Sequence, residues 1–286
     1  MMKPSLLAVL CLTVVDLHAI VLPPSTLQTS GHQQPESIHE AASGVGMGAD
    51  TGVQPTAFPF WDNIGTVGLG TGLYLGNGWV LTSTHVGCRP FVLSDGSNYR
   101  PVPGTWRVLK NADGSKSDLA VFQVQQGASD SALRKLFNIS ISTETVESQT
   151  PVLLVGTGYV EQKSTGDQNQ NPARFGAYQR STREKRWALA TTNEVSAPAG
   201  TRGGLKTHCF ATTFRKQAFG GQAAEGDSGG AAFVFDAESL QWKLAGCIFA
   251  VSQVNTFVPY GARTYVGDLA AYGPQLEELI CSSRER

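Results

Sequence analysis

The sequence predicts an all-β fold made of two packed β-barrels or one large sandwich. From residue 55 onward, short apolar runs follow one another, separated by turn residues. Glycine accounts for 32 of the 286 residues and charged residues for only 16%, a composition that favours strands and tight turns over long helices. The Asn77-Gly78 pair lies between two apolar runs and is typical of a two-residue hairpin.

Twelve runs have the length and composition of strands. They are Ile64–Val67, Gly72–Leu75, Trp79–Ser83, Phe91–Leu93, Trp106–Leu109, Leu119–Val124, Val152–Val155, Trp187–Ala190, Cys209–Thr213, Ala231–Phe235, Leu244–Val251 and Thr264–Val266. Helical patterns occur only at 131–136 and 268–282, and Gly273-Pro274 interrupts the second. The polar stretch 161–186 is expected to be a long exposed loop.

The N-terminal segments predict export. Lys3, the apolar run Leu6–Val15 and the small residue Ala19 have the order of a secretory signal peptide over residues 1–19. An apolar run of this length is too short to span a bilayer, so no membrane span is expected after cleavage. Residues 20–54 are rich in Pro, Ser, Gln, Gly and Ala, which predicts a linker or pro-segment before a domain over 55–286. The mature protein is expected to be periplasmic or extracellular, and monomeric.

Charge and cysteine content exclude several classes of function. The 22 basic and 23 acidic residues give a net charge of -1, which argues against a nucleic-acid partner. Loss of the signal peptide would remove Cys11 and leave four cysteines, enough for two disulfides with three connectivities; they are Cys88, Cys209, Cys247 and Cys281. No CxxC pair, metal-ligand cluster, phosphate loop or dinucleotide motif is present, so neither a metal nor a cofactor is expected.

Three segments carry side chains suited to nucleophilic catalysis. They are the run from Trp79 to His85, the run from Ser117 to Phe122 with Asp118, and Gly226-Asp-Ser-Gly-Gly with Ser228. A serine hydroxyl needs a neighbouring imidazole to take its proton, and a carboxylate to orient and stabilise that imidazole. Glycines around a serine allow a tight turn whose backbone N–H groups point at a developing oxyanion.

Chain order distinguishes between two serine-hydrolase architectures. The segment around Ser228 also fits the G-x-S-x-G pattern of α/β-hydrolases, but that fold needs a histidine after the serine. The last histidine here, His208, precedes Ser228. The order His85, Asp118, Ser228 is that of the chymotrypsin-like enzymes. Asp62 and His208 are weaker rivals for the carboxylate and the base, because neither lies in a matching strand or turn.

On these motifs the region from Phe58 to Cys281 resembles the trypsin/chymotrypsin family of serine endopeptidases, of the exported bacterial sort. The resemblance implies two packed six-stranded antiparallel β-barrels, with the site between them and a C-terminal helix. It implies that His85 is the general base, Asp118 its orienting partner and Ser228 the nucleophile. The N–H groups of Gly226 and Ser228 would form the oxyanion hole. Substrates would be proteins or peptides, cleaved through an acyl-enzyme.

The chain departs from the family pattern in its cysteines and its activation sequence. Val86 and Ala224 occupy positions where the family usually has cysteines, so the family's disulfide map does not transfer. In the family, the aspartate at Asp227 pairs with an amino terminus released by cleavage. No basic residue followed by an Ile-Val-Gly-Gly-like start precedes the first barrel. We therefore expect either that Asp227 has another partner or that the chain folds into an active enzyme without cleavage.

The resemblance also locates the pocket for the substrate side chain. Gln222 lies at its base, and Phe249, Ala250 and Val251 replace the family's usual wall of Ser-Trp-Gly. This set predicts a narrow pocket that takes a small or polar side chain. Two other functions remain open at this stage: an esterase-type acyl hydrolase with the same triad, and a non-catalytic binding module on a protease scaffold.

Overall fold

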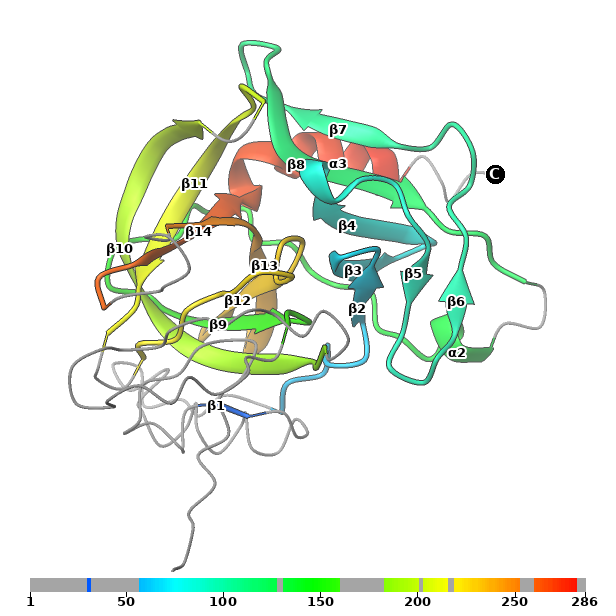
Figure 1. Ribbon diagram of the computed structural model, residues 1–286, viewed down its shortest axis with the longest axis horizontal. Helices are drawn as coiled ribbons and strands as arrows, with labels where there is room; N and C mark the ends of the chain where they lie inside the picture. Colours follow the sequence, from blue (N-terminus) through cyan, green and yellow to red (C-terminus); the bar gives the residue numbers. More distant parts are fainter. Residues whose placement is uncertain are drawn as a thin grey trace, which may run out of the picture.

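The computed structural model describes residues 30–31, 57–127, 131–159, 183–200, 203–215, 219–252 and 260–281. The expected signal peptide and most of segments 20–54 and 161–186 lie outside these ranges. The described chain forms two antiparallel β-sheets that lie side by side in Figure 1, the first in blue to blue-green and the second in green to orange except for the short blue strand β1.

The first sheet holds seven short strands in the order β6-β5-β2-β3-β4-β8-β7. Their bounds are β2 (Ile64–Val67), β3 (Gly70–Gly76), β4 (Trp79–Ser83), β5 (Phe91–Val92), β6 (Asn98–Tyr99), β7 (Arg107–Lys110) and β8 (Lys116–Gln123). The β3–β4 connection is the expected hairpin, with Asn77 and Gly78 at φ 50° and 81°. Two short helices follow strands of this sheet: η2 (Thr84–Val86) after β4 and α2 (Ser131–Arg134) after β8.

The second sheet closes on itself, because β9 pairs with both β10 and β12. The closed barrel has six strands: β9 (Pro151–Gly156), β10 (Arg186–Gly200), β11 (Lys206–Thr213), β12 (Ala231–Asp236), β13 (Gln241–Val251) and β14 (Arg263–Asp268). A two-residue strand, β1 (Ser30–Gly31), pairs with Trp187 and Ala188 of β10. The chain then continues into η3 (Leu269–Tyr272) and α3 (Gly273–Cys281).

All twelve expected strands are present, most of them longer by one to several residues. The double-barrel prediction is confirmed, with two differences: each sheet has one additional two-residue strand, β6 in the first and β1 in the second, and neither carries an apolar run. The interrupted C-terminal helix is also confirmed, as the 3₁₀ turn η3 followed by α3. The expectation of an exposed loop over residues 161–186 is wrong at the C-terminal end of that segment. Arg186 belongs to β10 and is only 3% exposed.

The two barrels pack against each other through β4 and β8 on one side and β11 and β13 on the other. Every residue of β4 is buried, as expected for a strand covered on both faces. The C-terminal helix α3 crosses back to the first barrel, where the Gln275 amide bonds both backbone groups of Lys110 in β7, at 2.9 Å and 2.6 Å. No helix in the described ranges is long and apolar enough to cross a membrane.

Candidate active site

His85 lies on η2, the single turn that follows β4 at the contact between the barrels. β8 pairs with β4, and the register Ser83↔Leu119 places Asp118 beside this turn. The His85 Nδ1 atom is 2.8 Å from Asp118 Oδ2, and the His85 backbone N–H donates to Asp118 Oδ1 at 3.0 Å. Asp118 is 2% exposed, whereas the His85 side chain is 41% exposed. The carboxylate is therefore buried behind an imidazole whose other edge faces solvent.

Neighbouring hydrogen bonds hold the Asp118 segment in place. The Asp118 backbone N–H donates to Thr207 Oγ1 at 2.8 Å, which ties β8 to β11 of the other barrel. Thr84 Oγ1 donates to the Ser117 carbonyl at 3.1 Å. Because a carboxylate only accepts hydrogen bonds, a neutral His85 ring bonded to it would carry its proton on Nδ1 and leave the Nε2 lone pair free. This is the tautomer that a general base needs.

Ser228 lies in the tight segment 226–230 before β12, and hydrogen bonds bring this segment to the His85 turn. The Ile248 carbonyl accepts from Gly229 N–H at 2.7 Å and from Ser83 Oγ at 2.9 Å. The Ile248 carbonyl thus links Gly229, which follows Ser228, to Ser83, which lies two residues before His85. In addition, a Cβ atom built on Gly70 would lie 2.5 Å from Val86 Cγ2 and 2.7 Å from the Ser228 carbonyl oxygen. The segments that carry His85, Asp118 and Ser228 therefore meet between the barrels.

The N–H groups of Gly226 and Ser228 are oriented by the carbonyls of their own peptide units. The Glu225 carbonyl accepts from Tyr159 N–H at 3.0 Å, and the Asp227 carbonyl accepts from Gly230 N–H at 2.7 Å. A trans peptide points its N–H opposite to its C=O, so both N–H groups point away from these partners. Within the described part of the chain neither N–H has an acceptor. Two unused donors are thus available beside Ser228.

Asp227 points away from this surface and is fully buried. Its Oδ1 accepts from Gly158 N–H at 2.7 Å and its Oδ2 from Ala224 N–H at 2.8 Å. A Cβ atom on Gly156 or Gly158 would lie 2.2 Å or 2.7 Å from Oδ1, so these glycines leave the space that the carboxylate fills. Burial raises the pKa of Asp227 to about 6, although both N–H donors and nearby arginine charges act in the opposite direction.

Of the residues expected to line the specificity pocket, Gln222 lies just before the nucleophile segment (226–230), and the other three form the end of β13. Gln222 is fully buried, and neither polar atom of its amide has a hydrogen-bond partner in the described part of the chain. Phe249 is 2% exposed, and Ala250 and Val251 are partly exposed at the end of β13. A buried amide without a partner is unfavourable unless a ligand supplies one.

Comparison with known families decides which family this chain belongs to. The family model described as Trypsin matches residues 50–270 of the chain. This chain belongs to the trypsin family. It is therefore a serine-type endopeptidase. A search of curated proteins finds no match.

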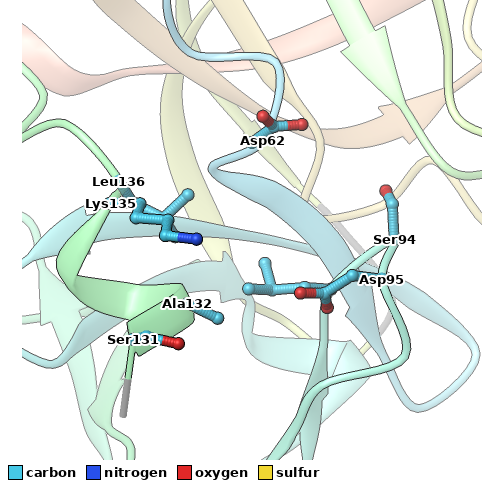
Figure 2. Close-up of a pocket in the computed structure, with 8 residues that line it drawn as sticks. Asp62, Ser94, Asp95, Ser131, Ala132, Lys135 and Leu136 are labelled. Atoms are coloured by element: carbon cyan, nitrogen blue, oxygen red, sulfur yellow. The ribbon is translucent and has the colours of Figure 1, made fainter.

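For this trypsin-family enzyme, the rival site residues can now be set aside. Asp62 lines a cavity of about 250 Å³ beside α2 with Ser94, Asp95 and Lys135, and contacts neither His85 nor Ser228 (Figure 2). His208 lies on β11, where its backbone N–H donates to Tyr272 Oη at 3.0 Å. The hydrogen bond between His85 and Asp118 therefore favours Asp118 over Asp62 as the orienting carboxylate and His85 over His208 as the base.

The two disulfides that the sequence would allow do not both form in the structure, which has no bridge among the three cysteines whose side chains it describes. Cys88, Cys209 and Cys247 all carry thiols, and two bridges among four cysteines would need at least one between two of these three. Cys209 and Cys247 both lie opposite Gly267 on β14, so one strand separates them. Two strand spacings of about 4.8 Å exceed the Cα separation that a disulfide allows. The side chain of Cys281 lies outside the described residues.

Sequence reasoning missed one group next to the trypsin-family site. Arg183, expected in an exposed loop, instead reaches under the 226–228 segment, and Thr71 and Thr157 bond the same region. No local pattern could have revealed this, because Arg183 stands in a polar stretch 43 residues before its partner Gly226. No cluster of three metal-ligating side chains occurs among the described residues.

Proposed function

We propose that this trypsin-family enzyme cleaves peptide bonds with His85, Asp118 and Ser228 as its catalytic triad. The observation that carries the proposal is the hydrogen bond of 2.8 Å between the exposed imidazole of His85 and the buried carboxylate of Asp118. The shared Ile248 carbonyl supports the placement of Ser228 beside this pair.

The chemistry proceeds in two acyl-transfer steps. Ser228 Oγ attacks the substrate carbonyl carbon while His85 Nε2 takes the hydroxyl proton, and Asp118 stabilises the imidazolium. The oxyanion accepts hydrogen bonds from Gly226 N–H and Ser228 N–H. The tetrahedral intermediate collapses when His85 returns the proton to the leaving amine, which leaves an acyl-enzyme on Ser228. Water then attacks the ester, with His85 again as base, and releases the acid product.

Hydrolysis of a peptide library by the purified mature protein tests this assignment. Ser228→Ala is expected to reduce kcat by about 10⁴-fold or more. Ser94→Ala, a serine in the cavity of Figure 2, serves as the matched control and is expected to leave kcat unchanged. Equal activity of Ser228→Ala and the wild type would refute the triad.

The same assay addresses the two alternative functions. An esterase-type acyl hydrolase would turn over short esters while leaving peptides intact, and a binding module would turn over neither. Both outcomes would contradict the proposal. The presence of a complete Ser, His and Asp set supports catalysis over binding alone.

We propose that the protein is exported, with residues 1–19 removed and residues 20–54 acting as a linker or pro-segment before the catalytic domain. The order of Lys3, the apolar run and Ala19 supports this proposal. N-terminal sequencing of the protein recovered outside the cytoplasm is expected to begin near residue 20. Deletion of residues 20–54 tests inhibition, because equal turnover with and without the segment would dismiss a pro-segment role.

We propose that the specificity pocket prefers a small or polar side chain on the acyl side of the cleaved bond. The buried and unpartnered amide of Gln222 supports this proposal, since a polar substrate side chain would supply its missing partner. Peptides with Gln, Ser or Ala at this position are expected to have higher kcat/KM than the Arg peptide. A faster Arg peptide would overturn the assignment.

A further inference from the structure

Arg183 stands just before β10, and its guanidinium lies beneath the nucleophile segment. Its Nε donates to the Thr157 carbonyl at 2.8 Å and its Nη1 to the Gly68 carbonyl at 2.9 Å. Its Nη2 is 2.6 Å from the Gly70 carbonyl oxygen, 3.0 Å from Thr157 Oγ1 and 3.3 Å from the Gly226 carbonyl oxygen. All three nitrogens of this partly buried cation therefore bond to oxygen atoms of the protein.

These oxygens come from three separate parts of the fold. Gly68 lies in the turn between β2 and β3 of the first barrel, and Gly70 begins β3. Thr157 follows β9 in the second barrel, and Gly226 belongs to the nucleophile segment. Arg183 thus connects both barrels to the residue whose N–H is proposed for the oxyanion hole. A planar guanidinium suits this arrangement, because its five N–H groups diverge in fixed directions.

Gly226 is the residue whose orientation depends most on this connection. With φ at +91° it joins two peptide units whose carbonyls are both bonded. The preceding carbonyl, of Glu225, accepts from Tyr159 N–H, and the carbonyl of Gly226 itself accepts from Thr71 Oγ1 at 3.0 Å and from Arg183. Arg183 also lies over the Tyr159 ring, 5.4 Å from its centroid, and pairs with Tyr159 in a β-bridge. Arg183 therefore contacts Tyr159, whose N–H orients the peptide unit that carries the Gly226 N–H, and also bonds the carbonyl of the peptide unit that follows.

The charge of Arg183 matches the buried carboxylate in the same segment. Asp227 directly follows Gly226, and its oxygens bond to the N–H groups of Gly158 and Ala224 rather than to a basic side chain. Arg183 and Arg186 are the two positive charges that act on Asp227 through space. A buried carboxylate in this position needs such a nearby charge to remain ionised.

We propose that Arg183 is a positioning residue that holds the 226–228 segment in its catalytic conformation and supplies Asp227 with a countercharge from within the chain. The inference rests on the proposed serine-protease function and adds to it the group that organises the oxyanion hole. On this account the segment needs no amino terminus released by cleavage. The uncut mature chain is therefore active.

Kinetics of Arg183→Met and Arg183→Lys, with Arg107→Met as the matched control, test the proposal. Arg107 also donates to two backbone carbonyls, those of Gly104 and Trp106, but it lies on β7 and does not contact the nucleophile segment. Arg183→Met is expected to lower kcat by about 10- to 100-fold with KM changed less than about threefold, because one oxyanion donor alone contributes about 10²–10³. Arg183→Lys keeps the charge with fewer hydrogen bonds and is expected to recover part of the loss. Arg107→Met is expected to match the wild type.

The outcomes separate this inference from the proposed function. The proposed function fails if the wild type does not cleave peptides. It also fails if the Ser228→Ala variant still cleaves them. If the wild type is active and Arg183→Met keeps kcat within twofold of Arg107→Met, the positioning role is wrong. N-terminal sequencing of the active wild-type protein gives a second check that does not depend on the folding of any variant. Activity that appears only after cleavage between residue 20 and the first barrel would also overturn the proposal.

Discussion

At the scale of single residues, Asp118 holds the His85 side chain in the orientation that the proposed mechanism needs. Its two carboxylate oxygens accept from different atoms of His85, one from the ring and one from the backbone. The two bonds together hold the ring in one orientation relative to the carboxylate. Since Asp118 is almost fully buried, water does not compete for these bonds.

Replacing Asp118 by Asn tests this role at the residue scale. The Asn amide would donate toward Nδ1 and shift the imidazole proton to Nε2, so His85 could no longer accept the proton of Ser228. We expect kcat at pH 7 to fall about 10⁴-fold, with little change in thermal stability. Asp113→Asn, at an exposed turn residue, is the control for loss of a carboxylate. A loss below tenfold would contradict the role of Asp118.

The pKa of Asp227 leads to a second residue-scale prediction. Because the folded pKa of about 6 lies above the ordinary value of 3.8, the ionised form is disfavoured in the folded state. The penalty disappears as the carboxyl takes up its proton. The free energy of unfolding of the wild type should therefore rise relative to Asp227→Asn as the pH falls from 7 to 4. Urea unfolding at several pH values measures this difference, and a difference of the opposite slope would refute the raised pKa.

At the scale of elements, the nucleophile segment depends on glycines where the chain turns tightly against β3. Gly229 has φ at +87°, and a Cβ atom there would lie 2.0 Å from the Thr71 carbonyl oxygen and 2.4 Å from Thr82 Oγ1. The segment can therefore pack this close to the first barrel only without a side chain at this position.

Alanine substitutions separate the two reasons for a glycine at position 229, which are its positive φ and its close approach to Thr71. Gly104 has a similar φ of +77° but open space around it, so Gly104→Ala should cost only the left-handed strain of about 1 kcal/mol. Gly229→Ala adds a steric clash, and we expect a loss of about 3 kcal/mol or more. Urea unfolding of both variants makes the comparison. Equal losses would show that the close approach to Thr71 is unimportant.

Sequence patterns predicted the elements that bury apolar runs and missed those that depend on tertiary contact. The strands β4 and β8 and the motifs that end or begin them were predictable, since local apolar runs and turn residues determine them. The two residues of β6, Asn98 and Tyr99, gave no such signal. Arg183 was misplaced for the same reason, because its partners come from distant segments of the chain.

At the scale of the whole molecule, the site exists only where the two barrels meet. The first barrel supplies His85 and Asp118, and the second supplies Ser228. The Ile248 carbonyl, the Thr207 hydroxyl and the Arg183 guanidinium each bond across this boundary. Relative motion of the barrels is therefore expected to change catalysis before it changes either barrel's own fold.

The absence of bridges between the three described thiols gives a whole-molecule prediction. Packing of the barrels, rather than disulfides among these cysteines, stabilises the fold. Thiol titration of the denatured but unreduced mature protein should therefore detect Cys88, Cys209 and Cys247. Reduction before denaturation should leave the melting temperature unchanged. A large drop in melting temperature on reduction would contradict the arrangement of thiols in the structure.

The most direct test of the central claim is the site of reaction with a fluorophosphonate. Such a probe reacts with a serine only when a base and an oxyanion hole activate it. Peptide mapping of the labelled mature protein is expected to find one adduct, on Ser228, and to find labelling slowed by at least about 10³-fold in His85→Ala. An adduct on another residue, or equal labelling of the folded wild type and His85→Ala, would contradict the account.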